Sequence, residues 1–207
     1  MNNSITGTAF VREVNDACTP LDAFSRFVSR PNVFFLDSAL SVNGISRYSF
    51  LGFNPFLVMK AKGRRVTLTD KDGTLENEGN PFEHLRNLLK QFSILNTDES
   101  IPFQCGAVGY LGYDLCHFIE RLPDKALDDI GLPDMYMAFY DTIICYDNHL
   151  GKCSVIGVDF GLDSAIRDRM EQIAGSLSGK TAVGIRTDEP ACEKRVTDPF
   201  LKFNFTK

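Results

Sequence analysis

The sequence lacks the features that direct a protein to a nucleic acid, a membrane or the secretory route. Its 22 lysines and arginines are outnumbered by 27 acidic residues, which gives a formal net charge of −5. Nucleic acids and anionic membranes attract clustered positive charge, so we expect neither as a partner. No apolar run approaches the length that spans a bilayer. The amino-terminus also lacks the basic start and uninterrupted apolar segment of a signal peptide.

Metal-ligand spacing is also missing. The six cysteines are scattered without a CxxC pair, and the three histidines show no ligand pattern, so no zinc site is predicted. Four cysteines lie among apolar neighbours, where cysteine acts as a small core residue. This usage favours a reducing, cytoplasmic location. The carboxylates Asp128, Asp129 and Asp134 are irregularly spaced and interrupted by proline, which favours turn caps over metal ligands.

The sequence does contain short strand-like segments broken by single helices. Helix starts are predicted at Thr19-Pro20 and Asn80-Pro81, where a capping side chain precedes a proline. Glu83 is placed to complete a capping box with Asn80. The first helix is expected to bury Leu21, Phe24, Phe27 and Val28, and a third helix to bury Leu162, Ile166, Met170, Ile173 and Leu177. Runs of strands without regular β-α alternation predict an α+β fold with a largely antiparallel sheet.

Three glycines at a spacing of three stand out in "QCGAVGYLGYDLCHF". Gly106, Gly109 and Gly112 do not match the dinucleotide fingerprint, and no Lys-Ser or Lys-Thr follows them as in a P-loop. Phosphate binding by backbone N–H groups is the less favoured interpretation of this run. The favoured interpretation is close packing of the glycines where a strand turns into a helix. Asp114 is then expected to cap that helix.

A polar group ends one of the apolar strands. Asp37 and Ser38 follow "NVFFL", and Arg47 lies after the next loop. A carboxylate, a hydroxyl and a guanidinium at a strand end can hold the ammonium and carboxylate of an amino acid. The same groups can instead satisfy the loop backbone and each other. Spacing alone favours this second reading.

The end of the chain combines polar and apolar residues in an unusual way. Residues 178–196 are polar and linker-like, but Phe200, Leu201, Phe203 and Phe205 follow at once. Crowded apolar residues favour a partner surface. We therefore expect a domain at residues 1–177, a linker at 178–207, and a natural protein that continues beyond Lys207.

Five blocks of sequence resemble one known family in order. They are "FFLDSAL", "RYSFLGFNPFLVMKAKG", "IPFQCGAVGYLGYDLCHFIERLP", "DDIGLPDMYMAFYD" and "FNFTK". Together they resemble the N-terminal region of the chorismate-utilising enzymes anthranilate synthase component I and aminodeoxychorismate (para-aminobenzoate) synthase component I. The resemblance extends from about Val33 to Lys207. "GYDLCHFIERLP" and "LPDMYMAFYD" look more like the para-aminobenzoate branch.

The resemblance implies a division of labour. In this family chorismate and Mg²⁺ are bound by a C-terminal chorismate-binding domain, which would begin where this chain stops. The N-terminal region packs against that domain, contributes to contact with a glutaminase subunit (component II), and supplies part of a tryptophan pocket. By resemblance Asp37 and Ser38 match the acidic residue and serine of that pocket, and Arg47 its basic residue. Asp37 stands where glutamate is common, which shortens its reach.

Two functions of different classes follow from these features. The first is the N-terminal structural or regulatory domain of aminodeoxychorismate synthase component I, a folate-pathway transferase; anthranilate synthase component I is the alternative branch. As a fragment it is expected to be inactive and to carry no catalytic residue or metal. The second is a stand-alone module that senses an aromatic amino acid or docks a glutaminase.

Overall fold

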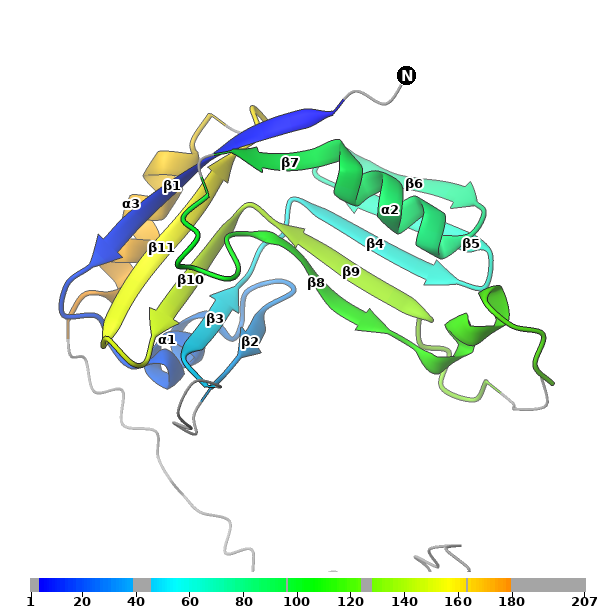
Figure 1. Ribbon diagram of the computed structural model, residues 1–207, viewed down its shortest axis with the longest axis horizontal. Coiled ribbons are helices and arrows are strands. Elements are labelled where there is room, and N and C mark those ends of the chain that lie inside the picture. The colour runs from blue at the N-terminus through cyan, green and yellow to red at the C-terminus, as the bar shows by residue number, and fades with distance from the viewer. Residues whose placement is uncertain (1–3, 39–45, 96, 124–127, 163, 180–207) are drawn as a thin grey trace, which may run out of the picture.

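Two β-sheets meet at an angle, and helices lie on the outer face of each (Figure 1). The computed structural model describes residues 4–38, 46–95, 97–123, 128–162 and 164–179. Within these ranges the strands of each sheet pair antiparallel, except for the parallel pair of β1 (Ile5–Val14) and β7 (Phe92–Leu95). The predicted α+β fold with largely antiparallel sheets is confirmed.

The first sheet has six strands and the more deeply buried centre. In spatial order they are β2 (Phe34–Leu36), β3 (Tyr48–Gly52), β10 (Thr142–Asp147), β11 (Lys152–Asp159), β1 and β7. Helices α1 (Pro20–Phe27) and α3 (Ile166–Leu177) pack against one face of this sheet. Side chains of the second sheet pack against the other face. As a result, all six residues of the central strand β10 are buried.

The second sheet has five strands. In spatial order they are β6 (Gly73–Glu78), β5 (Arg65–Asp70), β4 (Leu57–Lys62), β9 (Met135–Tyr140) and β8 (Gly106–Leu111). Helix α2 (Pro81–Gln91) covers one face. Met59, Met135 and Phe139 lie beneath it and are fully or almost fully buried. The turn from Lys71 to Gly73 joins β5 to β6.

A single residue separates two consecutive strands that belong to different sheets. Strand β9 ends at Tyr140 and β10 begins at Thr142, so Asp141 lies at the bend between them. The Arg169 guanidinium of α3 donates to the Asp141 carboxylate at 2.7 Å. Burial raises the pKa of the Asp141 carboxyl, and the charge of Arg169 opposes that rise. The ion pair therefore holds α3 against the bend.

Local capping forms two helices as predicted, with one exception in detail. Thr19 Oγ1 accepts the N–H of Asp22 at 3.2 Å, and Asn80 Oδ1 accepts the N–H of Phe82 at 2.9 Å. The predicted capping box is not observed, since no hydrogen bond joins the Glu83 carboxylate to the Asn80 N–H within the described residues. The Asn80 side chain caps the helix without it.

The residues predicted to be buried on α1 and α3 were wrong at one or both ends of each helix. Leu21 and Val28 are half exposed, whereas Ala23 and Phe27 face the core. Leu162 precedes α3 and is 41% exposed, while the other four residues of that predicted stripe are buried. The end residues differ because the sheet covers only part of each helix.

The described cysteines are free, and four of them are core residues. Cys18, Cys105, Cys145 and Cys153 are buried. Burial raises the pKa of Cys145 and of Cys153 to about 12, so both thiols stay protonated at neutral pH. Their predicted role as small core residues is confirmed. Among the described helices, none is long and apolar enough to cross a membrane.

The expected domain boundary lies at the end of the described structure. Helix α3 ends at Leu177, and Ser178 forms an isolated antiparallel bridge with Ala17. The predicted linker beyond Gly179, with Phe200, Leu201, Phe203 and Phe205, lies outside the described residues.

Candidate functional site

Asp37 and Ser38 both bond to a buried hydroxyl. They follow β2, which pairs with β3, and β3 carries the fully buried Ser49. Ser49 Oγ donates to Asp37 Oδ1 at 2.7 Å and accepts the N–H of Ser38 at 3.1 Å. It also accepts Asn148 Nδ2 at 2.8 Å, from the turn between β10 and β11. Three segments that are distant in sequence therefore converge on one hydroxyl.

Arg47 belongs to the same corner but has a different partner. Its Nε and Nη2 both donate to Asp147 Oδ2, at 2.9 and 2.6 Å. The other oxygen, Asp147 Oδ1, accepts the N–H groups of His149 and Leu150. The hydrogen bond from Arg47 and these backbone groups hold the pKa of the Asp147 carboxyl below its usual range. Asn148 N donates to the Arg47 carbonyl at 2.8 Å, which ties Arg47 to the same turn.

The arrangement satisfies its own polar groups and still leaves two charges accessible. The Arg47 side chain is 44% exposed and lies over the Tyr48 ring, with 4.8 Å between the guanidinium carbon and the ring centroid. Asp37 is exposed as well, and only its Oδ1 is bonded to Ser49. A carboxylate and a guanidinium at one corner suit a zwitterionic ligand. The corner is therefore a candidate amino-acid site, with Asp37, Ser38 and Arg47 on its surface.

Ser49, Asp147 and Asn148 complete this corner and do not follow from the sequence patterns. Ser49 lies inside a strand, where its hydroxyl carries no signal. Asp147 and Asn148 lie where β10 turns into β11. A turn residue normally caps its own loop. Only the pairing of β3 with β10 places them beside Asp37 and Arg47.

The glycine run forms a strand and a short helix. Gly106 to Leu111 is β8, and Tyr113 to Phe118 is the 3-10 helix η1. A Cβ on Gly109 would lie 1.8 Å from the Tyr136 carbonyl oxygen, so only glycine fits there. The N–H of Gly112 donates to the Asp134 carbonyl, and η1 has no side-chain cap, so the predicted cap by Asp114 was wrong. These contacts support close packing.

Two of the three predicted cap carboxylates share one lysine. Lys62 Nζ lies 2.6 Å from Asp128 Oδ2 and 2.8 Å from Asp134 Oδ1. Asp128 also accepts the N–H of Gly131, and Asp134 that of Gly63. Because the Lys62 ammonium lies between the two carboxylates and occupies an oxygen of each, the pair does not fit a divalent cation. The described part of the chain holds no group of three His, Cys, Asp or Glu suited to a metal ion.

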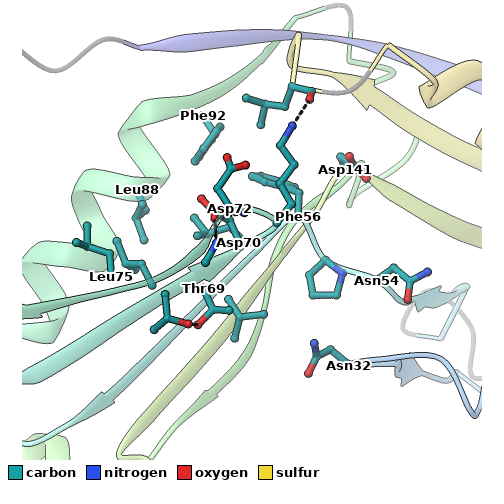
Figure 2. Close-up of a pocket in the computed structure, with 18 of the residues that line it drawn as sticks. Asn32, Asn54, Phe56, Thr69, Asp70, Asp72, Leu75, Leu88, Phe92 and Asp141 are labelled. Atoms are coloured by element: carbon teal, nitrogen blue, oxygen red, sulfur yellow. Dashed lines mark hydrogen bonds between the residues drawn. The ribbon is translucent and has the colours of Figure 1, made fainter.

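A separate groove lies where the two sheets meet. It has a volume of about 990 Å³ and is lined by residues of β4, the β5–β6 turn, the end of α2 and the bend at Asp141 (Figure 2). Asn32 and Asn54 lie at one end, and Leu88 and Phe92 at the other. None of Asp37, Ser38 and Arg47 lines it. Sequence patterns did not point to this groove.

Curated proteins of two related enzyme types match the chain. It is 36% identical over 142 residues to anthranilate synthase component 1 of Acetivibrio thermocellus, which covers 68% of this chain and 29% of that protein. It is 30% identical over 183 residues to aminodeoxychorismate synthase component 1 of Bacillus subtilis, which covers 86% of this chain and 38% of that protein. The chain is a homologue of these component I synthases.

The fold of a solved component I protein agrees with this homology. Anthranilate synthase component I of Streptococcus pneumoniae superposes with a TM-score of 0.56 at 22% identity, covering 80% of this chain and 36% of that one. No family model matches the chain. This component I homologue thus spans about a third of the length of the relatives it matches. Both enzyme names occur among those relatives.

Proposed function

We propose that this chain is the N-terminal domain of an aminodeoxychorismate synthase component I. The observation that carries the proposal is the match to the Bacillus subtilis protein of that name, over 86% of the chain. "GYDLCHFIERLP" and "LPDMYMAFYD" favour this branch by resemblance. The complete enzyme would replace the chorismate 4-hydroxyl with ammonia, on the path to para-aminobenzoate and folate. Anthranilate synthase component I is the alternative branch, supported by the match at 36% identity.

In this proposal the domain supports chemistry that another domain performs. Mg²⁺ would bind the chorismate carboxylates in a C-terminal domain and assist loss of the hydroxyl. The acidic pair Asp128 and Asp134 is bridged by the Lys62 ammonium and is not available to such an ion. The fragment by itself is therefore expected to be inactive.

Product analysis tests the proposal. The full-length protein is incubated with chorismate, ammonia and Mg²⁺, and the products are separated by chromatography. Aminodeoxychorismate is the expected product, and anthranilate would overturn the branch assignment. The 207-residue chain is assayed in parallel, and amination by this chain alone would overturn the division of labour.

An exposed apolar region supports a role in assembly. It lies at the end of the five-stranded sheet where β8 leads into η1 (Figure 1). The exposed large apolar residues of this region are Tyr110, Leu111, Tyr113, Ile119, Leu122, Ile130 and Leu132. Clustered exposed apolar residues mark interaction surfaces. The C-terminal domain and a component II glutaminase are the partners that the proposal assigns to the protein.

A second candidate is a module that senses an aromatic amino acid. The convergence of Asp37 and Ser38 on Ser49, beside the Arg47–Asp147 pair, favours it. Calorimetry with tryptophan tests this function on the fragment and on the full-length protein. Binding that Asp37→Asn weakens is the expected result, and absence of binding to both proteins would remove the candidate.

A further inference from the structure

The groove between the sheets has an apolar wall that faces solvent. Leu75 of β6 is 61% exposed and Leu162 is 41% exposed, and both line the groove. Phe56 and Phe92 form an edge-to-face pair in the same wall, with 5.1 Å between ring centroids. Apolar side chains gathered around a concave surface of this size are typical of small-molecule sites.

The charges around the groove leave two carboxylates without a cation. Arg169 and Asp141 neutralise each other, and Lys71 Nζ donates to the Leu162 carbonyl at 3.3 Å. Within the described ranges, neither Asp70 nor Asp72 takes part in an ion pair. Lys71 keeps its positive charge, because a carbonyl is neutral, so the unpaired charges of the groove are two carboxylates and one ammonium, a net charge of −1.

The two carboxylates are held by the turn that joins β5 to β6. Asp70 Oδ1 accepts the N–H groups of Asp72 and Gly73 at 2.8 and 3.2 Å, which fixes the turn. The Asp72 carboxylate lies on the side of the groove where Phe92 is found (Figure 2). A negative group beside an aromatic wall suits a ligand that combines a positive charge with an apolar body.

We propose that this groove binds a small amphipathic amine. The apolar body packs against Phe56, Phe92 and Leu75, and the ammonium lies between the carboxylates of Asp70 and Asp72. A carboxylic acid with the same apolar body is disfavoured, because the two carboxylates outnumber the single ammonium of Lys71. The site is separate from the Asp37–Ser38–Arg47 corner, and it stands independently of the enzyme branch.

A matched pair of probes tests the charge preference. Phenethylamine and 3-phenylpropionate share an apolar body and carry opposite charge at neutral pH. Each is titrated into the 207-residue chain at low salt, and binding is followed by amide chemical shifts in NMR spectra. Phenethylamine is expected to bind about tenfold more tightly, because two exposed carboxylates attract one probe and repel the other. The preference should shrink in high salt.

Variants connect that preference to the groove. Asp70→Asn with Asp72→Asn keeps the Oδ1 acceptor of the turn and is expected to abolish the preference for phenethylamine, because Lys71 is then the unpaired charge that remains in the lining. Leu75→Ser is expected to weaken both probes. Glu76→Gln is the matched control, because it removes a carboxylate from β6, next to Leu75, at a position outside the groove lining. Asp37→Asn controls for the separate amino-acid corner.

Several outcomes would overturn the proposal. It is wrong if phenethylamine causes no shifts at millimolar concentration, or if both probes bind equally. It is also wrong if Glu76→Gln or Asp37→Asn weakens binding as much as the Asp70 and Asp72 changes do. Shifts confined to groove residues and lost in the double variant support it.

Discussion

The two sheets of this molecule are buried to very different extents. In the six-stranded sheet, β10 is buried along its whole length between α1 and α3 on one side and the second sheet on the other. In the five-stranded sheet, α2 covers one face, and five of the six residues of the edge strand β6 are exposed. Both sheets contribute to the core, and the five-stranded sheet also presents a largely exposed edge strand.

The face of the five-stranded sheet opposite α2 packs partly on the six-stranded sheet, and beyond that contact it carries a continuous row of side chains. Tyr110, Tyr136, Lys60, Thr67 and Glu76 are direct neighbours across the five strands. The two tyrosine rings stack at 5.9 Å, and Lys60 Nζ lies 5.5 Å from the Tyr136 ring centroid. Polar and aromatic side chains tolerate solvent in this row. The two sheets therefore differ in what they expose: the centre of the six-stranded sheet is covered on both faces, whereas the five-stranded sheet presents polar and aromatic side chains to solvent.

Matched leucine truncations test this comparison with the largest expected effect. Leu51 of β3 is fully buried, whereas Leu75 of β6 is 61% exposed. Leu51→Ala is expected to lower the free energy of unfolding by about 4 kcal/mol, because it leaves a cavity. Leu75→Ala should cost about 1 kcal/mol or less, because little area returns to water. Urea unfolding measures the free energy of unfolding of both variants. Similar losses would contradict the difference in burial between the two strands.

The bend between the sheets gives the next largest effect. Arg169→Met leaves the Asp141 carboxylate without its cationic partner, and we expect a loss of about 3 kcal/mol at neutral pH. Adding Asp141→Asn removes the unpaired charge and should recover part of that loss. Burial raises the pKa of Asp141 above 3.8, so the deficit of Arg169→Met should shrink as falling pH protonates this carboxyl in the folded state. A deficit that is constant with pH would contradict the account.

Two glycine substitutions compare a tight site with an open one. Gly109→Val places a side chain against the Tyr136 carbonyl where β8 meets β9, and we expect a loss of about 2–3 kcal/mol. Gly175 lies in α3 with nothing within 4 Å of an added Cβ. Gly175→Ala should therefore gain about 0.5 kcal/mol from helix propensity. Thermal melting reports both, and an unchanged curve for Gly109→Val would refute close packing there.

The smallest effect concerns the amino-acid corner at the edge of the six-stranded sheet. The hydrogen bond from Arg47 lowers the pKa of Asp147 below 3.8. A lowered folded-state pKa adds stability above the unfolded value, and that stability is lost as pH falls through the folded value. Asp147→Asn should therefore be less stable than the parent chain at neutral pH and equal to it in strong acid. Chemical unfolding at a series of pH values measures the difference, and a difference that persists in acid would contradict this assignment.

Local signals predicted local structure well. Thr19 and Asn80 cap helices because each side chain bonds to a backbone N–H two or three residues away. The buried stripe of α3 follows from helical spacing alone. Sequence patterns did not predict strands β1 and β7, because each is stabilised by a partner far away in the chain. Ile5, for example, pairs with Phe92.

The candidate sites show the same limit. The sequence marked Asp37, Ser38 and Arg47, but the groups that hold them lie on Ser49, Asp147 and Asn148, which strand pairing brings near. The groove has no sequence signal, because its lining comes from segments between Ile5 and Arg169.

Sequence patterns predicted the helix starts, the strand character of the apolar segments and the resemblance to component I synthases. These depend on neighbours a few residues apart or on order along the chain. Sequence patterns did not predict which strands pair. Nor did they predict that Ser49 links three segments, or that Asp70 and Asp72 lie beside an apolar wall. Such contacts depend on which distant segments become adjacent, and that is set by packing the whole core at once.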